Sequence, residues 1–143
     1  MTEIYNTASP AETEKVGREL AEKLSEKLSF VCLYGDLGAG KTAFVRGFTS
    51  FFVPEAKVKS PTYSVVNEYR NGDTAVFHFD LYRFEDNPES LYDIGFDDYV
   101  AGGHCVFEWS EYMPEGAEPD DAVRVTIEKT GEETRKITIN TED

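Results

Sequence analysis

The sequence predicts one α/β domain over residues 1–143, built on a mixed parallel and antiparallel sheet with helices on both faces. Residues 30–34 form a continuous apolar run, and helically spaced apolar residues follow a glycine-rich segment, which is typical of a buried parallel strand and its helix. Residues 63–82 and 123–139 contain strand-like runs joined by turn residues, which indicates antiparallel hairpins. A chain of 143 residues is long enough to bury one core.

The glycine-rich segment fits the phosphate-binding pattern Gly-x-x-x-x-Gly-Lys-Ser/Thr without a mismatch. Its residues are Gly35, Asp36, Leu37, Gly38, Ala39, Gly40, Lys41 and Thr42. Backbone N–H groups of such a loop converge on nucleotide phosphates, and side chains at the glycines would obstruct that approach or the positive φ it requires. Lys41 adds a positive charge, Thr42 offers a hydroxyl to Mg2+, and the following helix directs its positive dipole end at the anion. The expected fold is therefore P-loop NTPase-like.

The charge of the chain limits its partners. Fourteen Lys and Arg residues against 28 Asp and Glu give a net charge of −14, and residues 84–123 contain twelve acids without one Lys or Arg. This field should repel a polyanion, so we expect no direct binding to nucleic acid by the chain alone. It also disfavours a nucleotide kinase, because phosphoryl transfer to a second substrate generally uses arginines as a clamp.

The chain begins without an apolar signal segment and has no apolar run near the ~18 residues that a membrane span needs. We therefore expect a soluble, cytoplasmic protein without a membrane contact. Cys32 and Cys105 both fall in apolar runs without metal-ligand spacing, so we expect buried free thiols.

The first expected helix starts at Ser9 as N-cap, with Pro10 at its first position and Glu12 three residues beyond the cap. Its apolar stripe has a spacing of four and comprises Val16, Leu20, Leu24 and Leu28. The helix after the phosphate-binding segment has apolar residues at helical spacing, namely Phe44, Val45, Phe48, Phe51 and Phe52.

An antiparallel hairpin is expected from residues 63–69 and 74–82, with a turn at Asn71 and Gly72. In the return strand, His78 and Asp80 lie on the same face. Short helical segments are expected at residues 88–93 and 97–100.

A second buried strand, residues 104–107, delivers Glu108 at its carboxyl end, as a Walker-B-like element does. Ligands of open α/β sheets bind at those ends. The last hairpin alternates from Val123 to Ile139, and Arg135 shares the parity of its inward-facing isoleucines. We interpret Arg135 as a surface residue at the strand end, with a nucleotide contact as the alternative.

Four motifs together resemble one family, the TsaE (YjeE) ATPases of bacterial tRNA threonylcarbamoyl-adenosine synthesis. They are residues 35–42, Ser60-Pro61-Thr62-Tyr63, His78-Phe79-Asp80-Leu81-Tyr82-Arg83 and Glu108-Trp109, in that order. The resemblance extends from the first helix through Trp109, whereas the acidic segment after it and the last hairpin carry no matching motif. It implies ATP hydrolysis within an assembly with the TsaB and TsaD proteins, which carry the tRNA-modifying chemistry.

The resemblance also implies roles for single residues. Lys41 and Thr42 take the phosphate and Mg2+ roles, and Thr62 belongs to a switch-like loop that senses the γ-phosphate. Of the two carboxylates, one should bind Mg2+ and the other should position the attacking water. We favour Glu108 nearer the metal, because it ends the buried strand, and Asp80 nearer the water.

Three further residues keep two interpretations each. Trp109, the sole tryptophan, packs in the core or lies against the switch-like loop or a ligand. We interpret His78 as a hydrogen-bonded strand residue rather than a metal ligand, because no second His or Cys stands at metal spacing. Arg83 either completes the site or binds a partner, or it forms a surface salt bridge.

The leading hypothesis is a regulatory ATPase subunit in tRNA modification. The alternatives are a small P-loop kinase, which should carry a lysine- or arginine-bearing lid, and a nucleotide-dependent binding module. A GTPase is disfavoured because the chain lacks an Asn/Thr-Lys-x-Asp segment for reading the base.

Overall fold

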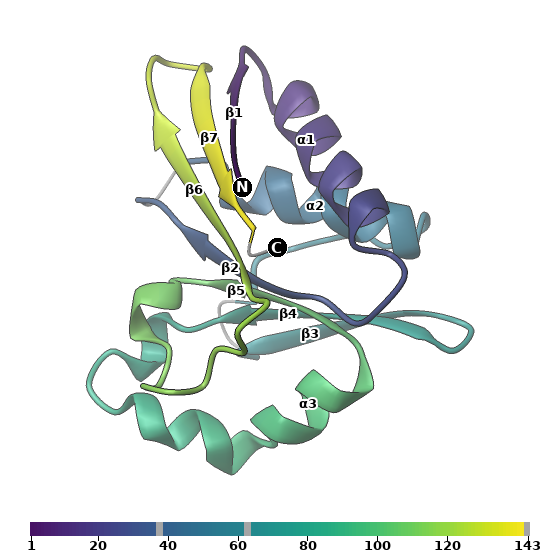
Figure 1. Cartoon of the computed structure of the whole chain (residues 1–143), viewed down its shortest axis with the longest axis vertical. Helices are drawn as coiled ribbons and strands as arrows, with labels where there is room; N and C mark the ends of the chain where they lie inside the picture. Colours follow the sequence, from purple (N-terminus) through teal and green to yellow (C-terminus); the bar gives the residue numbers. More distant parts are fainter. Residues whose placement is uncertain (37–38, 62–63, 142–143) are drawn as a thin grey trace.

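The computed structural model describes residues 1–36, 39–61 and 64–141. Its elements are, in chain order, β1 (Thr2–Thr7), α1 (Pro10–Lys23), β2 (Phe30–Tyr34), α2 (Lys41–Phe52), β3 (Val66–Asn71), β4 (Thr74–Asp80), the 3-10 helices η1 (Tyr82–Phe84) and η2 (Pro88–Ile94), α3 (Phe96–Gly102), β5 (His104–Glu108), the 3-10 helix η3 (Ser110–Tyr112), β6 (Val123–Lys129) and β7 (Arg135–Asn140). The described strands form one sheet in the order β1-β7-β6-β2-β5-β4-β3 (Figure 1).

The sheet is mixed, as the sequence predicts. Strand β5 pairs in parallel with β2 on one side and with β4 on the other, and β2 pairs in parallel with β6. The outer pairs β1–β7, β6–β7 and β3–β4 are antiparallel. Because β2, β5 and β4 run in the same direction, the residues that follow their carboxyl ends meet at one edge of the sheet.

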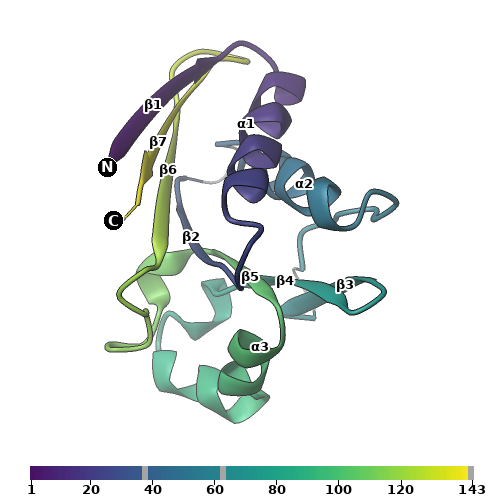
Figure 2. The ribbon, with the colours of Figure 1, turned by 45° about the vertical axis from the view of Figure 1, so that its right-hand side comes forward.

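Helices cover both faces of the sheet, which confirms the predicted α/β architecture. Helices α1 and α2 pack side by side on one face, over a core that contains Val31, Val76 and Val106 (Figures 1 and 2). Helix α3 and the 3-10 helices cover the other face, whose core contains Phe79, Cys105 and Phe107. Alternate residues of β4 and β5 therefore belong to different cores, so both strands are buried on both sides.

The contact between α1 and α2 is backbone against backbone. A Cβ atom at Gly47 would lie 1.8 Å from the carbonyl oxygen of Glu14, and one at Gly17 would lie 2.3 Å from that of Phe44. No residue with a Cβ atom fits at either position without displacing a helix. This contact fixes α1 on the helix that follows the phosphate-binding segment.

The amino-terminal prediction needs two corrections. The capping by Ser9 is confirmed, since its hydroxyl accepts a hydrogen bond from the N–H of Glu12, but α1 ends at Lys23. Leu28 lies beyond the helix and is 49% exposed, so it does not continue the apolar stripe. Strand β1 was not predicted. Its side chains are exposed or half-buried except at its last residue, so the sequence lacks an apolar strand pattern, and the strand is held by backbone pairing with β7.

The central hairpin is shifted relative to the prediction. Asn71 pairs with Thr74, so the two turn residues are Gly72 and Asp73 rather than Asn71 and Gly72. Strand β4 ends at Asp80 because η1 begins at Tyr82. The predicted short helices at 88–93 and 97–100 correspond to η2 and α3, which each extend beyond those bounds. Phe51, expected on the buried face of α2, is 37% exposed.

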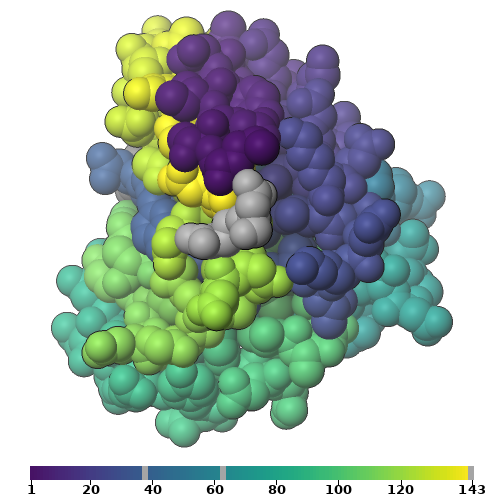
Figure 3. Space-filling view, in the orientation of Figure 1, coloured from purple at the N-terminus to yellow at the C-terminus, as the bar shows by residue number. Residues whose placement is uncertain are grey.

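The first and last described strands close one edge of the sheet. Thr2 pairs with Asn140 and Thr7 with Arg135, and the space-filling view shows the purple amino-terminal residues against the yellow β7 (Figure 3). Cys32 and Cys105 are free and buried, as predicted. Among the helices of residues 1–36, 39–61 and 64–141, none combines the length and apolar character that crossing a membrane requires.

Candidate functional site

The phosphate-binding segment connects β2 to α2, as the motif requires. Gly35 has φ 152° and Gly40 has φ 102°, a region that favours glycine. At Gly35 a Cβ atom would also meet the carbonyl oxygen of Ile127 at 2.6 Å, so the neighbouring strand β6, and not only a ligand, excludes a side chain there. Asp36 is exposed, Ala39 is buried, and Leu37 and Gly38 lie outside the described residues.

Lys41 is the first residue of α2 and is only 5% exposed. Its ammonium donates a hydrogen bond of 2.6 Å to the carbonyl oxygen of Gly35. Burial lowers the pKa of Lys41, while nearby carboxylates, first that of Glu108, act in the opposite direction. The ammonium thus lies under the loop, within the field of the acids at the sheet edge, and Thr42 is half-buried beside it in the first helical turn.

The two predicted carboxylates end adjacent parallel strands. Asp80 is directly paired with Glu108 in the β4–β5 register, which places both residues on the sheet face that α2 covers. Asp80 is half-buried, and its Oδ1 accepts a hydrogen bond of 3.0 Å from the N–H of Tyr82. Burial raises the pKa of Asp80, and the hydrogen bond from Tyr82 partly offsets this effect. The structure therefore brings together the two acids that sequence reasoning selected.

Glu108 is almost fully buried, with 4% exposure, and its Oε2 is hydrogen-bonded to Nε2 of His78. His78 is fully buried in β4, two residues before Asp80. This contact agrees with the interpretation of His78 as a hydrogen-bonded strand residue. Sequence reasoning found that His78 and Asp80 share a face but missed the hydrogen bond between His78 and Glu108. The signal was present, because all three residues have the same parity at the ends of neighbouring strands.

Trp109 follows Glu108 and has φ 59°, an uncommon conformation for a residue other than glycine. Its ring lies 3.7 Å from Nζ of Lys41 and packs against two tyrosines, Tyr82 at 5.2 Å and Tyr112 at 6.2 Å between ring centroids. Tyr82 is 54% exposed, so the cluster reaches the surface. Trp109 is half-buried between the lysine and this aromatic cluster and is not an ordinary core residue.

The segment after the expected switch-like loop is tied to Asp80. The N–H of Asp80 donates to the carbonyl oxygen of Val65, whose own N–H donates to that of Pro61, at 2.8 and 3.1 Å. Val65 has φ 68°, which is strained for a β-branched residue. Among the described residues other than glycine, Val65 and Trp109 alone have positive φ. Val65 is hydrogen-bonded to Asp80, and Trp109 directly follows Glu108 in the sequence. Thr62 and Tyr63 lie outside the described residues.

The two arginines considered from the sequence lie in different settings. Arg135 is half-buried, and its Nε donates a hydrogen bond of 2.9 Å to the carbonyl oxygen of Ala39. Its Nη1 bonds to the carbonyl oxygen of Thr134 at 2.8 Å, so it links the last hairpin to the phosphate-binding segment. Arg135 does lie at a strand end, as interpreted, but it is half-buried and bonded to the phosphate-binding segment rather than fully exposed on the surface. Arg83 is exposed and forms no ion pair with a described residue.

The donor groups of the site fit Mg2+. Thr42 offers a hydroxyl and Asp80 and Glu108 offer carboxylates, and Mg2+ prefers such oxygen ligands. Among the described residues, no three His, Cys, Asp or Glu side chains form a cage for a metal ion. Mg2+ usually binds through one or two carboxylates together with substrate phosphates and water, so this sparse set matches a metal that is held jointly with a nucleotide.

Comparison with known proteins identifies the family to which the sequence is similar. The family model of the threonylcarbamoyl adenosine biosynthesis protein TsaE matches residues 7–137. A tRNA threonylcarbamoyladenosine biosynthesis protein TsaE of Bacillus subtilis is 35% identical over 135 residues, which cover 94% of this chain and 82% of the relative. Its counterpart in Haemophilus influenzae is 41% identical over 119 residues, covering 80% and 74% of the two chains.

A solved structure extends the likeness to the fold. The crystal structure of YdiB from Bacillus subtilis superposes with a TM-score of 0.78 at 27% sequence identity, covering 99% of this chain and 86% of the other. The family model covers the phosphate-binding segment, both carboxylates and Trp109. The chain therefore belongs to the TsaE family.

Proposed function

We propose that this protein binds and hydrolyses ATP as an accessory subunit in the synthesis of N6-threonylcarbamoyladenosine in tRNA, and that it regulates a TsaB–TsaD pair through its nucleotide state. One observation carries the proposal. Lys41 of the phosphate-binding segment lies in the field of Asp80 and Glu108, two carboxylates paired at the ends of neighbouring parallel strands. A loop that holds phosphates beside two acids is suited to phosphoryl transfer to water.

The proposed chemistry assigns each group one task. The N–H groups of the loop and the start of α2 bind the phosphates, and Lys41 supplies positive charge to the β- and γ-phosphates. Thr42 and Glu108 would hold Mg2+, which would supply positive charge against the charge that develops on the phosphates. Asp80, half-buried and paired with Glu108 at the strand ends, would orient the attacking water by accepting a hydrogen bond from it. Trp109 and Arg135 hold Lys41 and the loop from two sides.

The partner dependence follows from how the site is assembled. Asp80 and Glu108 are already paired at the ends of β4 and β5, and we propose that alignment of the water also requires the segment before Val65, which comes from a separate part of the chain. We therefore propose slow hydrolysis by the chain alone and faster hydrolysis when TsaB and TsaD order the loop that contains Ser60, Pro61 and Thr62. With a net charge of −14, the chain would reach tRNA only through those partners.

Calorimetry of ATP binding tests the proposal. Lys41→Ala should weaken ATP binding roughly 10- to 100-fold, because a charged hydrogen bond contributes about 1.5–3 kcal/mol. Lys57→Ala is the matched control, since it removes an exposed lysine from the loop before β3 with the same change in net charge. Equal ATP affinity in Lys41→Ala and the wild-type protein would refute the nucleotide site.

Product analysis with γ-labelled ATP separates hydrolysis from transfer to another acceptor. The wild-type protein with TsaB and TsaD should release free labelled phosphate. A labelled small-molecule acceptor would instead indicate a kinase.

A further inference from the structure

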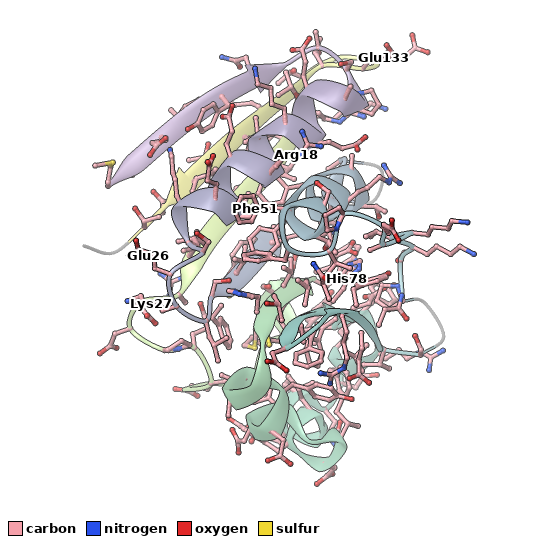
Figure 4. The ribbon with its side chains drawn as sticks, turned by 90° about the vertical axis from the view of Figure 1, so that its right-hand side faces the viewer. Arg18, Glu26, Lys27, Phe51, His78 and Glu133 are labelled. Carbon is pink, nitrogen blue, oxygen red and sulfur yellow. The ribbon has the colours of Figure 1, made fainter. Side chains whose placement is uncertain are left out.

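Nε2 of the fully buried His78 is hydrogen-bonded to Oε2 of Glu108, and Nδ1 of the same ring has no hydrogen-bond partner among the described residues. Figure 4 shows His78 in the interior, between α2 and the strands beneath it. Of its neighbours on this face of the sheet, Val76 and Val106 are fully buried and apolar, and Asn67, its register partner in β3, makes its side-chain hydrogen bonds to Ser64 and Lys59.

The single partner fixes where the ring carries its proton. A proton on Nδ1 would be buried without an acceptor in the described part of the chain, and an unpaired buried donor costs about 1–3 kcal/mol. A proton on Nε2 is instead donated to the carboxylate. His78 is therefore placed to act as a one-sided donor to Glu108, while its other nitrogen is buried without a hydrogen-bond partner among the described residues.

An apolar residue would fill this position at lower cost if packing were its only role. The strand already has valine at position 76 on the same face, and a buried polar ring with an unpaired nitrogen lowers stability relative to a well-packed aliphatic side chain. The bond to Glu108 is the one hydrogen bond that the His78 side chain makes with the described residues. Its benefit is therefore to be sought in what it does to that carboxylate.

We propose that His78 is a positioning residue that fixes the Glu108 carboxylate by one oxygen, so that the other oxygen is presented to the Mg2+ side of the site. The inference rests on the proposed function. Outer hydrogen-bond partners commonly orient carboxylates that bind metals, and their loss typically lowers metal affinity or activity 10- to 100-fold. Without His78, the Glu108 carboxylate at the end of β5 would lose the hydrogen bond that restricts its rotation.

Two amide variants separate positioning from packing. In His78→Gln the side-chain NH2 occupies the place of Nε2, as many bonds from the backbone, so it can still donate to Glu108. In His78→Asn the amide is one bond shorter and reaches only the place of Nδ1. Both variants are polar and smaller than histidine. A packing defect would lower thermal stability without raising the Mg2+ concentration for half-maximal turnover, so the Mg2+ dependence separates positioning from packing.

The expected result is a split between metal dependence and nucleotide affinity. His78→Asn should lower ATP turnover and raise the Mg2+ concentration for half-maximal turnover by roughly 10- to 100-fold, with metal-free ATP affinity unchanged. His78→Gln should recover most of both losses. His104→Gln controls for the loss of a buried histidine, because His104 begins β5 and lies at the opposite end of that strand from Glu108. Thermal melting of each variant shows that it is folded.

Nuclear magnetic resonance of the wild-type protein gives a readout that needs no activity. The chain has two histidines, and His78→Gln identifies the ring signals of His78 by their loss. Long-range 15N–1H correlations should show the proton of His78 on Nε2 and protected from exchange. A proton on Nδ1 would overturn the inference.

The kinetic outcomes also test the positioning role of His78 separately from the proposed function. Suppose that the wild-type protein hydrolyses ATP and that His78→Asn and His78→Gln have equal turnover and equal Mg2+ dependence. This result would overturn the positioning role and leave the proposed function intact. A wild-type protein that binds no ATP would overturn the proposed function and the inference with it.

Discussion

The ammonium of Lys41 lies 3.7 Å from the centroid of the Trp109 ring while it donates a hydrogen bond to the carbonyl oxygen of Gly35. A cation–π contact and a backbone carbonyl thus share one buried charge. To contact the β- and γ-phosphates of a nucleotide, the ammonium has to give up part of this arrangement. The environment of Trp109 therefore depends on the position of Lys41.

Trp109 fluorescence should report nucleotide binding without background, because it is the only tryptophan. ATP with Mg2+ should change its intensity or emission maximum, since the cation over the ring is displaced. Lys41→Met should show an altered spectrum that no longer responds to ATP, whereas Lys57→Met should behave as the wild type. A fluorescence titration measures this, and an equal response in both lysine variants would contradict the coupling.

Asp80→Asn and Glu108→Gln should abolish partner-stimulated hydrolysis far more than ATP binding. Both substitutions keep the shape of the side chain, and Glu108→Gln keeps an acceptor for His78, so the main loss is the charge. We expect turnover with TsaB and TsaD to fall roughly 100-fold, as for loss of one preorganised charged or hydrogen-bonding group, with ATP affinity within ~3-fold of wild type.

The control for these acids is Asp97→Asn, which removes an exposed acid from α3. A phosphate-release assay with a binding titration provides both numbers. Retained stimulation in either site variant would exclude that residue from the reaction.

His104 should make folding less favourable as the pH falls. Its ring is buried, stacks on Phe52 at 4.0 Å and accepts a hydrogen bond from the N–H of Ser29, and burial lowers its pKa below 6.5. A lowered folded-state pKa means that the unfolded chain binds more protons, so this stability is present above pH 6.5 and is lost as the pH falls through the folded-state pKa.

The difference in Tm between wild type and His104→Gln measures this contribution. It should favour the wild type near pH 7.5 and narrow towards pH 5.5, because both proteins share every other titrating group. A pH-independent difference would show that His104 contributes only packing.

Gly47→Ala should destabilise the protein strongly, because its methyl group would overlap the backbone of Glu14 in α1. Overpacking costs typically 1–3 kcal/mol and more against a backbone, so we expect ~3 kcal/mol and a fall in Tm of about 10 °C. Gly102→Ala is the control, since its nearest new contact, with Phe77, is an ordinary 3.9 Å. Calorimetric melting compares the two, and similar Tm values would show that α1 shifts to make room.

The central layer of the fold was predictable from the sequence because each of its signals is local. The apolar run of β2, the glycines and lysine after it and the carboxylate that ends β5 are each read within a few residues. Strand β1 was not predictable in the same way. Its pairing with β7 depends on a segment more than a hundred residues away, and its side chains are largely exposed.

The composition of the site was easier to predict than its contacts. Residue types selected Asp80 and Glu108, and the parallel register then places them side by side. The bond of Arg135 to Ala39 and the contact of Lys41 with Trp109 arise from how loops pack in three dimensions, which no local spacing encodes. The predicted turn of the central hairpin lies one residue before the observed turn, because Asn-Gly and Gly-Asp are both good turn sequences.

The sheet order has a consequence for how the chain reaches its structure. Helices α1 and α2 pack on each other and share a core with Val31 and Leu33 of the intervening strand β2, so these three consecutive elements can associate while little chain entropy is lost. Pairing of β1 with β7 joins residues at opposite ends of the sequence and must wait for a far larger loop to close. We therefore expect the unit around the phosphate-binding segment to assemble early and the β1–β7 edge to form last, so that substitutions in β1 accelerate unfolding while leaving the folding rate nearly unchanged.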